Sequence, residues 1–64
     1  MFLQIGDVAV NMDNVTRVEF RTEIPTVLIS VFVYVGRNEY VYFGGNDADR
    51  FKAWWDKEAE VYRA

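Results

Sequence analysis

The sequence predicts an α+β fold, an antiparallel meander of four to five strands with one C-terminal helix packed on one face. Short runs within residues 1–43 alternate apolar and polar side chains between turn residues, which is typical of strands. After Gly45 the apolar residues repeat instead at helical spacing, namely Ala48, Phe51, Trp55, Ala59 and Tyr62. We therefore expect residues 1–64 to form a single domain.

The first two expected strands form a hairpin. Residues 3–5 and 8–10 flank Gly6-Asp7, and this pair predicts a tight turn in which glycine supplies a positive φ. The shared inner face would contain Leu3, Ile5, Val8 and Val10. The next four residues, Asn-Met-Asp-Asn at 11–14, predict a second turn, because Asp and Asn side chains bond to the backbone two residues on.

The pattern of residues 15–21 predicts a strand with one solvent-exposed face. Its apolar residues Val18 and Phe20 point one way, and its charged residues Arg17, Glu19 and Arg21 point the other way. The following break contains Pro25, which cannot donate to a sheet ladder.

Residues 26–35 have the strongest strand pattern in the chain and predict a central strand. One face would contain Val27, Ile29, Val31, Val33 and Val35, and the other would contain Leu28, Ser30, Phe32 and Tyr34. Because both faces are largely apolar, we expect the strand to be covered on both sides.

Residues 36–39 join this strand to the last one, at 40–43, where Val41 and Phe43 are expected to face the core. Gly44-Gly45 ends that strand, and we expect Asn46 or Asp47 to be the helix N-cap. The helical spacing predicts that Phe51 and Trp55 are buried against the core strands, with Trp55 at the centre. Their expected partners are Val18, Phe20, Val41 or Phe43.

The composition excludes several kinds of site. The chain has no Cys and no His, so it lacks disulfides, thiolate ligands, and the commonest metal ligand and general base. A formal charge of −3 argues against nonspecific binding to nucleic acid or to anionic membranes. The longest apolar run, residues 31–35, is too short to span a bilayer, and we see no signal or transit peptide. We expect a cytoplasmic location.

Enzymatic activity is not expected. Ser30 is the only serine and lies within the apolar central strand, without a neighbouring base. Capping explains Asp47 and Asp49, which are two positions apart on a helix and do not face each other. Gly44-Gly45 could hold a phosphate before a helix, but the loop lacks a Lys partner and these aspartates would repel an anion. We therefore predict no catalytic residue, no metal site and no cofactor.

The side of the central strand away from the helix predicts an interaction surface. It would contain Leu28, Ser30, Phe32, Tyr34, Tyr40 and Tyr42. Such a patch is larger than a monomer usually exposes, so we expect a homo-oligomer, with a dimer favoured. The alternative is that the sheet curls and covers these residues within one chain. The resulting functional hypothesis is a small non-enzymatic binding or assembly module that acts through contacts with a protein partner that the sequence does not identify.

A second hypothesis is binding of single-stranded nucleic acid, because arginines interleaved with tyrosines can stack on bases. The candidate residues are Arg17, Arg21, Arg37, Tyr40 and Tyr42. Four antiparallel strands followed by one helix resemble the single-strand-binding domain of the PC4 transcriptional coactivator family, which implies the same ligand. The chain departs from that family at its first hairpin, which contains Asp7 and no basic residue.

Most of the chain also resembles small uncharacterised bacterial proteins that combine a β-meander with a C-terminal Trp-containing helix. The similar segments are Val10-Asn11-Met12-Asp13-Asn14-Val15, Val18-Glu19-Phe20 and the helical positions Ala48, Phe51, Trp54 and Trp55. These positions are turn and core residues, so the resemblance implies a fold and no activity.

Overall fold

The computed structural model describes residues 1–23 and 27–58. It contains β1 (Phe2–Ile5), β2 (Val8–Asn11), the 3₁₀ turn η1 (Met12–Asn14), β3 (Val15–Glu23), β4 (Val27–Val35), β5 (Glu39–Gly44) and α1 (Gly45–Glu58). Thr26, Ala59 and Tyr62, for which the sequence made predictions, lie outside the described residues, as does the side chain of Ile29.

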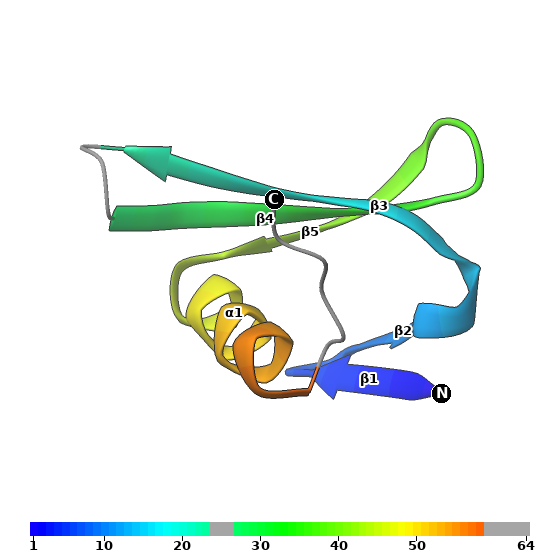
Figure 1. The fold of residues 1–64 in the computed structure, drawn as a ribbon, viewed down its shortest axis with the longest axis horizontal. Coiled ribbons are helices and arrows are strands. Elements are labelled where there is room, and N and C mark those ends of the chain that lie inside the picture. The colour runs from blue at the N-terminus through cyan, green and yellow to red at the C-terminus, as the bar shows by residue number, and fades with distance from the viewer. Residues whose placement is uncertain (24–26, 59–64) are drawn as a thin grey trace.

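The strands form two antiparallel sheets, β1–β2 and β3–β4–β5. In Figure 1 the helix α1 and the hairpin β1–β2 lie on the same side of the three-stranded sheet, and α1 contacts β4, β5 and β1. The predicted α+β class, with antiparallel strands and a C-terminal helix on one face, is confirmed. The other face of the three-stranded sheet is covered by no described element (Figure 1).

The first hairpin forms as the alternating pattern predicts. Leu3 lies opposite Val10, and Ile5 lies opposite Val8. Ile5 and Val10 are buried, whereas Val8 is exposed at the end of the inner row. Gly6 has a φ of +59°, which is the left-handed conformation that the tight turn requires. In the following turn the Asn11 side chain accepts a hydrogen bond from the backbone N–H of Asp13.

The core lies between the three-stranded sheet and the layer formed by α1 and the hairpin. Its fully buried members include Val31, Val33, Ala48 and Phe51. Phe51 contacts Phe43 and Phe20 at ring-centroid distances of 5.6 and 6.1 Å, as the helical spacing predicts.

The prediction that Trp55 is the centre of the core is wrong. Trp55 is only partly buried and contacts Phe20 at 5.6 Å, whereas Phe51 is fully buried. The helix also begins earlier than predicted, at Gly45, so Asn46 and Asp47 lie in its first turn rather than at the N-cap. There the Asp47 carboxylate pairs with Arg50 at 3.3 Å.

The predicted faces of β4 hold from Ser30 to Val35 but are wrong at its start. The register between β3 and β4 shifts after Arg21, where Arg21 pairs with Ser30 but Thr22 pairs with Leu28. This bulge moves one extra β4 residue past β3 and reverses the faces. Leu28 consequently packs against the core, and Val27 is 58% exposed.

Candidate protein-interaction surface

The face of the three-stranded sheet away from α1 is a small array of aromatic and charged side chains, which we call the open face. The strand registers arrange it in three rows across β3, β4 and β5. These rows are Arg17–Tyr34–Tyr40, Glu19–Phe32–Tyr42 and Arg21–Ser30–Gly44. The open face is therefore charged along β3, mostly aromatic along β4 and dominated by tyrosine along β5.

Glu19 binds both arginines of the β3 edge. Its two carboxylate oxygens lie 3.3 Å from Arg17 Nε and 3.0 Å from Arg21 Nη2. The Tyr34 hydroxyl also donates to Glu19, at 3.4 Å. Because one carboxylate holds two guanidinium groups, the charged edge has an ordered alternation of positive, negative and positive groups.

The same two arginines cover the aromatic residues of β4. The guanidinium carbon of Arg17 lies 4.1 Å from the centre of the Tyr34 ring, and that of Arg21 lies 5.3 Å from the centre of the Phe32 ring. Both distances are within the range of cation–π attraction. This covering explains why Phe32 and Tyr34 are only partly exposed.

The tyrosines of β5 are less covered. Tyr40 and Tyr42 are each 54% exposed, and both rings contact Phe32, at centroid distances of 5.2 and 5.3 Å. Tyr40 also contacts Tyr34, at 5.6 Å. The four rings form one connected cluster whose most exposed part is on β5.

The Tyr42 ring lies over Gly44, where a Cβ atom would be 2.7 Å from the tyrosine oxygen. Ser30, which pairs with Gly44, is only 5% exposed, so its hydroxyl is not available on the open face.

The structure brings together most of the residues that the sequence predicts for an interaction surface. Phe32, Tyr34, Tyr40 and Tyr42 form the ring cluster, and Ser30 lies beneath its edge. Leu28 does not belong to this face, because the bulge turns its side chain toward the core.

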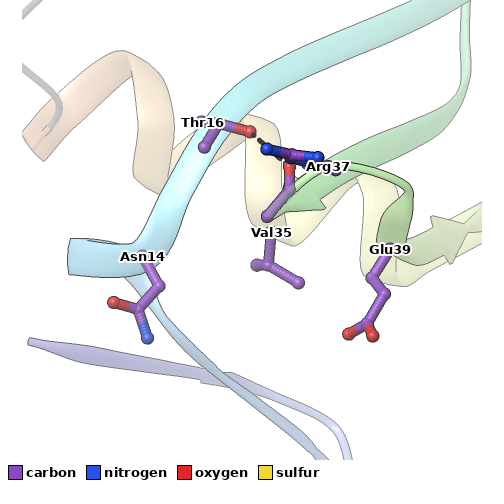
Figure 2. Close-up of a pocket in the computed structure, with 6 residues that line it drawn as sticks. Asn14, Thr16, Val35, Arg37 and Glu39 are labelled. Carbon is purple, nitrogen blue, oxygen red and sulfur yellow. Dashed lines mark hydrogen bonds between the residues drawn. The ribbon is translucent and has the colours of Figure 1, made fainter.

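Arg37 is also absent from the rows of the open face. It lies in the turn between β4 and β5 and lines an open hollow of about 510 Å³ with Asn14, Thr16, Val35, Gly36 and Glu39. Figure 2 shows the side chains of Asn14, Val35 and Glu39 extending toward the same side of this hollow. The Thr16 hydroxyl donates to the backbone carbonyls of Tyr34 and Gly36.

The sequence interpretation placed Glu19 on the charged face of its strand but missed that it pairs with both arginines. The signal was present in the spacing, since residues 17, 19 and 21 share one face of a strand and the acidic residue is in the middle. The close approach of Tyr42 to Gly44 had no comparable signal, because Gly44 could be explained as a strand terminator.

Among the described residues, no three acidic side chains gather as a metal site would require. In the same part of the chain, no helix is long and apolar enough to cross a membrane. No protein-family model, no curated protein and no solved structure matches the chain. The two resemblances noted from the sequence therefore stay predictions, and the functional argument rests on the open face.

Proposed function

We propose that the protein is a small non-enzymatic assembly module that acts in the cytoplasm through protein–protein contacts made by the open face. The observation that supports this proposal is that the described helix and hairpin cover only one side of the three-stranded sheet. The helix α1 and the hairpin β1–β2 share one side of this sheet (Figure 1). The strand registers place a cluster of four aromatic rings on the other side.

Aromatic residues and arginine are the types most enriched at the centres of protein interfaces. Tyr40 and Tyr42 offer rigid apolar rings with a hydroxyl that can bond across a contact or to trapped water. Arg17 and Arg21 both pair with Glu19 and lie over the rings of Tyr34 and Phe32, which favours the side-chain positions that a partner would meet. The open face is therefore preorganised for a contact.

The size of the open face sets the strength to expect. Three strands spaced about 4.8 Å apart, over the six residues of β5, give a footprint of roughly 14 by 20 Å. Stable interfaces usually bury about 800 Å² on each partner, which exceeds this footprint. We expect a dissociation constant in the micromolar range or weaker.

Sedimentation of two matched glutamate variants tests the proposal. Phe32→Glu places a charge at the centre of the open face, and Phe2→Glu places the same charge on β1, where Phe2 is 70% exposed. At a concentration of about 500 μM, we expect wild type and Phe2→Glu to have an apparent mass above the 7.5 kDa of the monomer. We expect Phe32→Glu to have the mass of the monomer. A wild-type chain that stays at 7.5 kDa, or a loss of mass only in Phe2→Glu, would overturn the proposal.

The second candidate function is binding of single-stranded nucleic acid, to which the resemblance to the PC4 coactivator domain also points. The observation in its favour is the arrangement of Arg17 and Arg21 beside exposed Tyr40 and Tyr42, since aromatic rings and guanidinium groups both stack on bases. Against it, Glu19 neutralises part of the positive charge, and the chain is acidic overall.

A titration with a fluorescent single-stranded oligonucleotide at low salt separates the two candidates. We expect no micromolar binding. Saturable binding that weakens steeply with added salt, and that Arg17→Ala or Tyr40→Ala reduces, would favour the second candidate.

A further inference from the structure

We infer that the partner of the open face is a second copy of this chain, related by a two-fold axis that runs close to parallel with β4. In this arrangement β3 of each copy lies over β5 of the partner. The inference rests on the proposed function, whose test is already self-association, and adds to it the direction of the axis that relates the two copies.

Few face-to-face arrangements of two identical sheets are favourable. Packed sheets usually keep their strands within about 30° of each other, at a separation of about 10 Å. A two-fold axis that brings the same face together must lie in the plane between the sheets, so it runs either nearly along the strands or nearly across them. These two arrangements place different residues opposite each other.

An axis across the strands would place β3 over β3. If this axis passes through the middle row, so that the two open faces overlap fully, Glu19 would face Glu19 of the second copy, and Arg17 would face Arg21. Like charges that face each other directly are unfavourable. The exposed tyrosines would meanwhile face only β5 of the partner and find no cationic group there.

An axis along β4 places β3 of each copy over β5 of the other copy. Each row of one copy then lies over the same row of the other copy. Arg17 then lies over the partner copy's Tyr40, where a guanidinium plane can stack on a phenol ring. In the middle row Glu19 lies over Tyr42, whose hydroxyl can donate to the carboxylate. The charged edge and the tyrosine edge are thus complementary halves of one self-complementary surface.

The third row is consistent with the same axis. Arg21 would lie over Gly44, where the Tyr42 ring of the second copy covers the strand, so the guanidinium group of Arg21 meets an aromatic ring. The row is flanked by Ser30, which is buried and small. No like charges face each other in this arrangement.

The two axes also predict different positions for the turn between β4 and β5. With the axis along β4, both copies of this turn lie at the same end of the dimer, roughly 10–20 Å apart. With the axis across the strands, they lie at opposite ends, roughly 30 Å or more apart, because Asn38 is about 15 Å along the strand from Phe32.

A spin label at Asn38 measures this separation. Asn38 is exposed in the turn, and the chain has no cysteine, so Asn38→Cys gives one specific label site. Arg37→Cys provides a neighbouring site if the first variant is unstable. The sample is labelled chain at about 500 μM, and dilution with unlabelled chain identifies the intermolecular signal.

We expect dipolar broadening that corresponds to a separation below about 20 Å between the two labels. The broadening should disappear when the labelled chain also contains the Phe32→Glu substitution. A separation of about 30 Å or more, also lost with Phe32→Glu, would overturn the inferred axis and leave the proposed function intact. The absence of any coupling, with a mass of 7.5 kDa, would overturn both. Coupling that persists in Phe32→Glu would also overturn both, because the contact would then lie elsewhere.

Discussion

The phenol ring of Tyr42 occupies the space that a side chain at Gly44 would need, since a Cβ there would be 2.7 Å from the tyrosine oxygen. Gly44 does not have the positive φ of Gly6, Gly36 and Gly45. A side chain at Gly44 is therefore opposed by the position of the Tyr42 ring, which would have to shift, rather than by backbone conformation. An aromatic ring laid over a strand glycine also compensates for the packing that the glycine lacks.

This relationship predicts coupling between the two positions. In a Tyr42→Ala background, Gly44→Ala should stabilise the protein by about 0.5–1 kcal/mol, because alanine suits a strand better than glycine. In wild type the same change must displace the ring, so we expect it to be less favourable by about 1 kcal/mol. Urea unfolding of the four chains measures the difference, and equal effects in both backgrounds would show that the ring does not occupy this space.

The described core predicts that Phe51→Ala destabilises the protein more than Trp55→Ala does. Phe51 is fully buried, and truncation of such a ring to alanine typically costs about 3–5 kcal/mol. A domain of this size has about 3–5 kcal/mol of stability in total, so Phe51→Ala should be mostly unfolded at room temperature. Trp55 is only partly buried, and we expect Trp55→Ala to keep a cooperative thermal transition. The reverse order in a melting experiment would contradict the described core.

The turn at residues 11–14 contains a hydrogen bond and an ion pair, and their contributions to stability should respond differently to added salt. Asn11 accepts from the backbone N–H of Asp13, and Asn11→Ala should cost about 1 kcal/mol at any salt concentration. The Asp13 carboxylate pairs with the terminal ammonium of Met1 at 2.8 Å, but both groups are exposed. Asp13→Ala should therefore cost under about 1 kcal/mol, and less as salt is added.

Asn11→Asp is the control for this comparison, because it keeps the side-chain oxygen that caps the turn. We expect it to unfold at nearly the urea concentration of wild type. If Asp13→Ala proved more destabilising than Asn11→Ala at high salt, the capping bond would not be the main stabilising contact of the turn.

The alternating pattern predicted the fold class because it determines which side of each strand is apolar. Val18 and Phe20 pack against the core as their spacing indicated, with Arg17, Glu19 and Arg21 on the opposite face. The same rule identified Tyr40 and Tyr42 as outward-facing residues. Alternation suffices wherever the register is regular.

The alternation rule fails where the register slips. The shift after Arg21 reverses the faces of Leu28 and Val27, and a bulge between two apolar residues leaves no mark in a run that is apolar on both sides. The choice between Phe51 and Trp55 as the core centre likewise depends on how the helix is rotated against the sheet. Helical spacing predicts a shared stripe and not which member is deepest.

The central claim is that molecules of this protein meet through the open face, and a concentration series by NMR tests it most directly. Between about 1 mM and about 10 μM, the ring resonances of Phe32, Tyr40 and Tyr42 should shift, while those of Phe2 on the hairpin should stay constant. Ring resonances of the open face that do not change with concentration, or changes confined to Phe2, would contradict the claim.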